Sequence, residues 1–151
     1  MGALAYRTET VIRRSPEAVF DYCSDLRSEL QWNPQVKYIE KVTDGPVGVG
    51  TRYRARWANS GPTTVEVVVF DRPRSWETTT TARGVRIRFQ GTVTDAGPGA
   101  RYTASLELQP EGPARLVAPL ALLAMRRQDR KNMRRVREAL ESSTVTRSTE
   151  R

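Results

Sequence analysis

The chain has 151 residues, is 38% hydrophobic and carries a net charge of +8, which favours one folded domain with a substantial core. It has no histidine and one cysteine, which excludes His-dependent zinc sites and triads and any internal disulfide, so we expect no metal and no cofactor. It also lacks an apolar run of about 18 residues and a secretion-type N-terminus, so we expect a cytoplasmic protein. We expect it to be a monomer or a homodimer.

The N-terminal part predicts a strand followed by two short helices. Residues 6–14 alternate between two faces, which is typical of a strand. Ser15 and Pro16 then suit the N-cap and the first position of a helix. A second helical turn over residues 28–31 should end at Trp32-Asn33-Pro34, because the residue before a proline disfavours helical geometry.

The middle of the chain predicts an antiparallel meander. Strand patterns separated by turns rich in Gly, Pro, Asn and Asp cover residues 36–42, 51–58, 63–70, 75–83, 85–94 and 101–108. One face of these strands is mostly apolar, and the other carries charges of both signs. A sheet with one wet face needs a cover on its apolar side.

A long amphipathic helix over residues 119–141 can provide that cover. Its apolar stripe consists of Leu122, Met125, Met133, Val136 and Leu140. Residues 114–151 carry +6 of the net charge, which indicates either a solvated helix face or a surface for an anionic partner. We prefer the solvated face and do not expect nucleic acid as a partner. Residues 142–151 are rich in Ser and Thr, and we expect a disordered tail.

Several motifs carry a resemblance to a known superfamily. They are Ile12 followed by residues 15–20, Trp32-Asn33-Pro34, residues 48–53 at the opening of a strand, and residues 72–76 in a hairpin. With the order of elements, they resemble the helix-grip superfamily of START-like, polyketide cyclase/dehydrase and plant-allergen-like proteins (SRPBCC). The resemblance implies an α+β domain over residues 1–141. A curved seven-stranded antiparallel sheet would wrap around the long C-terminal helix, with two short helices between strands 1 and 2.

The resemblance also implies an internal cavity for a hydrophobic or amphipathic small molecule. The inward face mixes aromatic side chains with threonine and alanine, whereas a solid core would favour large aliphatics throughout. Such a mixture leaves room for a ligand, although the same residues could simply fill a core. The candidate cavity residues are Thr8, Thr10, Trp32, Tyr53, Trp57, Val67, Trp76, Thr78, Phe89, Tyr102, Leu122, Met125, Asp129, Asn132 and Met133.

Asp129 is the most informative single residue, because it interrupts the apolar stripe of the long helix. A carboxylate there needs a partner or a raised pKa. It could anchor a ligand or act as a general acid or base. It could instead form an ion pair with Arg126, Arg130 or an arginine of the sheet. Trp32 could lie at the cavity mouth or pack against the long helix.

Three hypotheses of function follow. The leading one is the binding of a small hydrophobic or aromatic metabolite, lipid or polyketide-like, between the sheet and the C-terminal helix. The second is an aromatic polyketide cyclase/dehydratase in which Asp129 and Tyr53 move protons while arginine orients carbonyls. The third is an interaction module whose basic helix meets an anionic partner, nucleic acid or a membrane surface.

Overall fold

The computed structural model describes the backbone of residues 4–58 and 60–149, and the side chains of the same residues up to 142. The elements follow the predicted order. They are β1 (Leu4–Ile12), α1 (Pro16–Cys23), the 3-10 turn η1 (Leu26–Ser28), α2 (Glu29–Trp32), β2 (Val36–Lys41), β3 (Arg52–Trp57), β4 (Gly61–Asp71), β5 (Ser75–Ala82), β6 (Val85–Ala96), β7 (Gly99–Pro110) and α3 (Ala114–Thr149).

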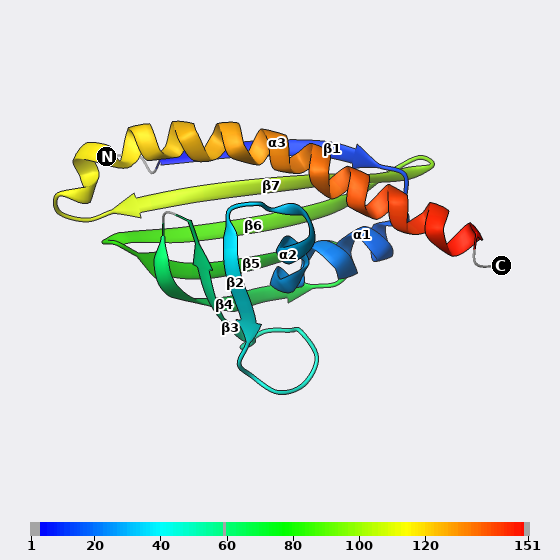
Figure 1. Cartoon of the computed structure of the whole chain (residues 1–151), viewed down its shortest axis with the longest axis horizontal. Coiled ribbons are helices and arrows are strands. Elements are labelled where there is room, and N and C mark those ends of the chain that lie inside the picture. Colours follow the sequence, from blue (N-terminus) through cyan, green and yellow to red (C-terminus); the bar gives the residue numbers. More distant parts are fainter. Residues whose placement is uncertain (1–3, 59, 150–151) are drawn as a thin grey trace.

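Seven strands form one antiparallel sheet in the order β1-β7-β6-β5-β4-β3-β2. The meander runs from β2 to β7, and β1 joins it beside β7, where Thr8 lies opposite Ala104. α3 packs mainly along β1, while α1 lies on β6 and β7, and α2 contacts both β2 and α3. Figure 1 shows the sheet curving beneath α3 with the short helices on its inner side. This arrangement confirms the predicted helix-grip fold.

The start of α1 follows from its sequence. The hydroxyl of Ser15 accepts a hydrogen bond from the backbone N–H of Ala18 at 3.1 Å, and Pro16 occupies the first turn. Arg72, in the turn between β4 and β5, forms a salt bridge with Asp21 of α1 at 2.7 Å. α1 is thereby held over the inner face of the sheet.

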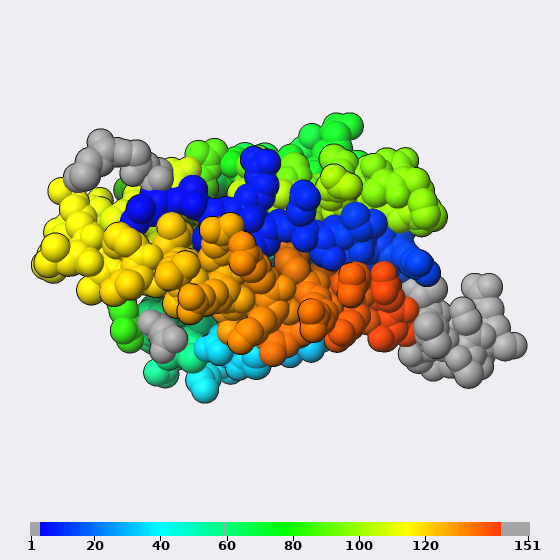
Figure 2. Space-filling view, turned by 90° about the horizontal axis from the view of Figure 1, so that it is seen from above, coloured from blue at the N-terminus to red at the C-terminus, as the bar shows by residue number. Residues whose placement is uncertain are grey.

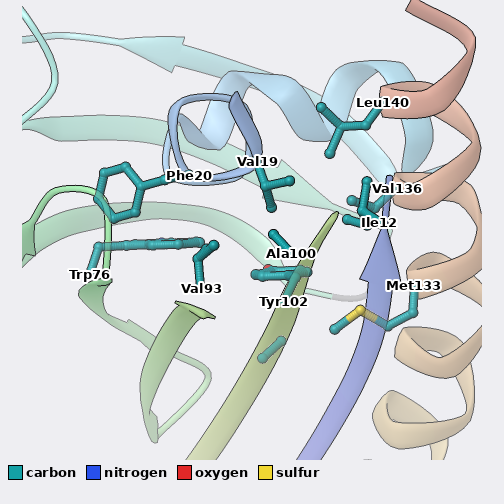
Figure 3. Close-up of a cluster of buried hydrophobic side chains, with 11 residues drawn as sticks. Ile12, Val19, Phe20, Trp76, Val93, Ala100, Tyr102, Met133, Val136 and Leu140 are labelled. Carbon is teal, nitrogen blue, oxygen red and sulfur yellow. The ribbon is translucent and has the colours of Figure 1, made fainter. Parts of the chain in front are cut away.

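The main core forms around Trp76 on β5. Its ring meets that of Phe20 edge-on, with 5.3 Å between the centroids, and stacks on Tyr102 at 5.9 Å with an interplanar angle of 4°. Figure 3 shows Phe20 and Tyr102 converging on this region, with Met133 reaching toward it from α3. Gly91 makes space for the indole, since a Cβ at that position would lie 2.3 Å from Cζ2 of Trp76.

α3 is longer than predicted at both ends. It begins at Ala114 rather than at residue 119, and Pro119 lies inside the helix. It also continues beyond residue 141 to Thr149, so residues 142–149 of the predicted disordered tail are helical. Extending an existing helix costs little, because each added residue fixes one more backbone hydrogen bond without a new nucleus. Residues 150–151 lie outside the described residues.

One predicted strand face changes side along β4. The pairing of β4 with β5 shifts between Val67 and Val69, so Val67 is buried whereas Val69 is 37% exposed. The added residue of a bulge reverses the alternation of side chains, which a strict period of two cannot predict. Phe70 consequently turns inward and packs against Phe20, with 5.2 Å between the ring centroids.

None of the helices in the described part of the chain combines the length and the continuous apolar character needed to cross a bilayer.

Candidate functional site

Asp129 points inward from α3 and meets the first strand. The hydroxyl of Tyr6 on β1 donates a hydrogen bond to Oδ2 of Asp129. Burial raises the pKa of Asp129, and hydrogen bonds from Tyr6 and Asn132 only partly oppose this effect. Burial and the neighbouring carboxylate also raise the pKa of Tyr6. The acid is thus paired with a phenol, and no salt bridge joins it to an arginine among the described residues.

Glu29 of α2 is a second interior carboxyl group. Its Oε2 atom accepts hydrogen bonds from Nε1 of Trp57 at 2.9 Å and from Nδ2 of Asn33 at 3.0 Å. Desolvation raises its pKa to about 7, and the negative charge of Asp129 adds to this rise. Glu29 and Asp129 both keep some accessible surface despite their desolvation.

Three buried polar side-chain atoms have no hydrogen-bond partner among the described residues. They are Oγ1 of Thr8, Oγ of Ser28 and Nε1 of Trp32. Thr8 follows Tyr6 on the inward face of β1, and Ser28 and Trp32 flank Glu29 in the chain. An unsatisfied buried donor or acceptor costs about 1–3 kcal/mol, so a polar partner at any of these atoms would stabilise the folded protein.

Tyr102 of β7 belongs to the main core. Burial raises the pKa of its phenol, and the proximity of Cys23, Glu29, Asp129 and Tyr6 adds to the effect. The same ring stacks on Trp76. The interior therefore has an aromatic wall from the sheet and acidic groups from α2 and α3.

Tyr53, the second predicted catalytic residue, is placed differently from Asp129. It is fully buried, and its hydroxyl donates to Oδ1 of Asp25 at 3.4 Å. Asp25 also caps η1 by accepting from the backbone N–H of Arg27 at 3.0 Å. Burial and Asp25 raise the pKa of Tyr53 to about 12. The structure pairs Asp129 with Tyr6, and Tyr53 joins β3 to η1.

The remaining predicted cavity residues fall into three groups. Leu122 and Met125 pack with Phe89 against the cluster around Tyr6, whose hydroxyl bonds to Asp129. Trp76 and Met133 belong to the main core, and Val67 packs with Tyr53 in a separate cluster. The others are distributed as follows: Thr78 and Asn132 are buried, Thr10 is half-buried, Trp32 packs against the main core, and Trp57 binds Glu29.

An open pocket of about 480 Å³ lies between α2 and the C-terminal half of α3. Trp32, Asn33 and Pro34 form one side, and Arg135 and Glu138 lie on the other. Its volume is within the range that small-molecule sites occupy. Trp32 lines this pocket and also packs against the main core.

Glu29 is the functional candidate that the sequence does not reveal. The predicted turn over residues 28–31 contains Leu30 beside it, and burial of the leucine would be the natural expectation. The structure has the opposite orientation, with Leu30 54% exposed and Glu29 directed inward. The reason lies in the tertiary structure. The indole N–H of Trp57 and the amide of Asn33 donate hydrogen bonds to the carboxyl group and so offset the cost of burying it.

The curved sheet, the long helix and the polar interior define a helix-grip protein of the START-like class. Solved structures with this fold include Ara h 8.0201, with 16% identity, a TM-score of 0.71, and coverage of 93% of this chain and 99% of that chain. A START superfamily protein from Mycobacterium smegmatis shows 17% identity, a TM-score of 0.71, and coverage of 91% and 99%. The Zhui aromatase/cyclase from Streptomyces sp. R1128 shows 11% identity, a TM-score of 0.75, and coverage of 93% and 94%. At these identities the likeness concerns the fold alone.

A family model described as polyketide cyclase/dehydrase and lipid transport matches residues 4–141. The chain therefore belongs to the polyketide cyclase/dehydrase and lipid transport family. No curated protein matches it.

Proposed function

We propose that the protein binds a small hydrophobic or aromatic metabolite that carries a hydroxyl or carbonyl group, in the interior between the sheet and α3. The supporting observations are the buried polar atoms of Thr8, Ser28 and Trp32 that have no hydrogen-bond partner among the described residues, and the inward-facing carboxyl groups of Glu29 and Asp129. The family includes lipid transport proteins, which agrees with an apolar ligand.

The surroundings define the chemistry that such a ligand needs. Phe89, Leu122 and Met125 offer apolar contacts on the side of β1 and α3. The hydroxyl of Thr8 and the indole N–H of Trp32 can donate hydrogen bonds to oxygen atoms of a ligand, and the carboxyl groups can accept a hydrogen bond from a ligand hydroxyl. A purely hydrocarbon ligand would leave these groups unsatisfied, so a ligand with polar substituents binds better.

Replacing Thr8 by valine tests this assignment, because valine keeps the shape and removes the hydroxyl. We expect Thr8→Val to raise the free energy of unfolding of the ligand-free protein by about 1 kcal/mol, since one unsatisfied buried group disappears. The same change should weaken the binding of 2-naphthol about tenfold, while binding of naphthalene stays unchanged. Chemical denaturation and fluorescence titration measure the two effects.

Thr94→Val is the matched control, because Thr94 is exposed on β6. It should leave both affinities unchanged. If wild-type protein binds neither compound, and native mass spectrometry of protein from its own host finds no bound small molecule, the ligand-binding proposal fails. If Thr8→Val binds 2-naphthol as tightly as the wild type, Thr8 is not part of the site.

A cyclase or dehydratase is the second candidate, and one observation favours it. A carboxyl group with a pKa of about 7, such as Glu29, can both give and take a proton near neutral pH. Glu29 would act as the general acid or base, together with Asp129 and its partner Tyr6. This modifies the sequence-based hypothesis, in which Tyr53 has that role.

Carboxyl-to-amide variants separate the two candidates. If the protein is an enzyme, Asp129→Asn and Glu29→Gln should each abolish turnover of a polyketide-like substrate while its affinity stays within about tenfold, a loss below about 1.4 kcal/mol. Parallel losses of turnover and affinity would indicate a binding role for the carboxyl groups. Steady-state kinetics and equilibrium titration of the same variants provide the two values.

A further inference from the structure

The first part of α3 exposes large apolar side chains to solvent. Leu116 is 84% exposed, Val117 61%, Leu120 73% and Leu123 48%. Other residues of the same segment face the core. Ala118 is buried, and Leu122 and Met125 pack against the cluster of Tyr6, Leu106 and Leu108. The exposed residues therefore do not contribute to the core, and an apolar patch of this kind marks an interaction surface.

This apolar patch continues directly into a row of cations. At 3.6 residues per turn, positions 116, 120, 123, 127, 130, 131 and 134 fall on one side of the helix. The first three are leucines and the last four are Arg127, Arg130, Lys131 and Arg134, all exposed. Figure 2 shows α3 lying open along one side of the molecule, from its yellow first turns through its orange middle.

Between positions 114 and 137 the outward side of α3 has no acidic residue to balance these cations, and the first exposed acid on that side is Glu138, one turn beyond Arg134. Asp129 is the only acid between positions 114 and 137, and it turns inward to Tyr6. The four cations form no salt bridge with any other residue that the structure describes. Their charge is therefore available to a negatively charged partner.

We propose that this side of α3 docks on an anionic lipid surface, with Leu116, Leu120 and Leu123 entering the interface and the four cations meeting the headgroups. A lipid bilayer supplies an apolar layer and a negative surface next to each other, which matches the order of these residues along the helix. Nucleic acid would use the cations but leave the leucines in water. A second copy aligned on the same row would bring like charges together.

Vesicle flotation tests this docking without reference to the ligand in the interior. The full-length protein should bind vesicles of phosphatidylcholine and phosphatidylserine at least about tenfold more tightly than vesicles of phosphatidylcholine alone, and added salt should weaken this binding. The double variant Leu120→Gln, Leu123→Gln should lose at least about tenfold in affinity. The triple variant Arg127→Gln, Arg130→Gln, Arg134→Gln should lose a similar factor.

Matched controls are available on other surfaces. Val49→Gln changes an apolar side chain that is 69% exposed, and the triple variant Arg54→Gln, Arg56→Gln, Arg86→Gln removes three exposed cations from the outer face of the sheet. Both controls should bind vesicles like the wild type, and circular dichroism should show that every variant is folded.

Three results would overturn the proposal. The first is equal binding to neutral and anionic vesicles, or no binding to either. The second is binding to a short DNA duplex that the arginine variant loses and the leucine variant keeps, with no binding to vesicles. The third is a homodimer in light scattering that the leucine variant converts to a monomer, which would assign the patch to a second copy.

Discussion

Trp76→Ala is expected to lower the free energy of unfolding by about 3–5 kcal/mol, the range for removing a large aromatic side chain from a core. The indole is 2% exposed and contacts the rings of Phe20, Phe89 and Tyr102. Its loss would leave a cavity at the point where β5, β6, β7 and α1 meet. Urea denaturation followed by circular dichroism measures the change.

Tyr38→Ala provides the comparison, because Tyr38 is 37% exposed on β2 and its truncation should cost less than about 1 kcal/mol. Gly91→Ala adds an independent check, since its Cβ would collide with the indole and should cost about 1–3 kcal/mol. In a Trp76→Phe background that cost should shrink, because the smaller ring leaves room. Strictly additive losses would show that Gly91 and Trp76 do not constrain each other.

Glu29→Gln is expected to change how stability depends on pH. The pKa of Glu29 rises from 4.5 to about 7 in the folded state, so folding favours its protonated form. This group therefore destabilises the protein progressively as the pH rises from about 4.5 to about 7, by roughly 1–3 kcal/mol in total. The neutral amide of glutamine removes this loss, and its carbonyl can still accept from Trp57 and Asn33.

Denaturation curves at several pH values between about 4 and 8 measure the effect. Asp129 has a raised pKa as well, so a smaller loss of the same sign should remain in Glu29→Gln. Glu40→Gln, at an exposed position of β2, is the control and should follow the wild-type profile. A Glu29→Gln profile identical to that of the wild type would show that Glu29 is hydrated in solution.

The fold was predictable because its signals are local and periodic. Alternation located every strand to within a few residues, and the N-cap at Ser15 and the proline at Pro16 located the first helix. The stripe of Met133, Val136 and Leu140 does face the core. The bulge beside Val67 was not predictable from the sequence. One added residue moves every following side chain of the strand to the opposite face of the sheet, and no sequence motif indicates where this happens.

The candidate site was predictable only in part. The inward direction of Asp129 follows from its place on the helical stripe, but its partner does not, since Tyr6 lies 123 residues away in the chain. Nothing in the sequence indicated that Glu29 faces the interior, because a four-residue helix is too short to show a clear periodicity. Leu116 lies before the expected start of the helix at residue 119, and Leu120 and Leu123 lie within the expected helix but off its apolar stripe, so this exposed patch was not predicted.

The sequence by itself determined the element order and the inward acid on the long helix, because periodicity and capping act over a few neighbouring residues. The helix-grip class came from the resemblance of its motifs to that superfamily. Only the tertiary structure decided which groups meet in the interior. It paired Asp129 with Tyr6, turned Glu29 toward Trp57 and buried the Thr8 hydroxyl where none of the described residues bonds to it. These outcomes depend on how β1, β3, α2 and α3 pack against one another, since hydrogen bonds and desolvation are properties of the assembled interior.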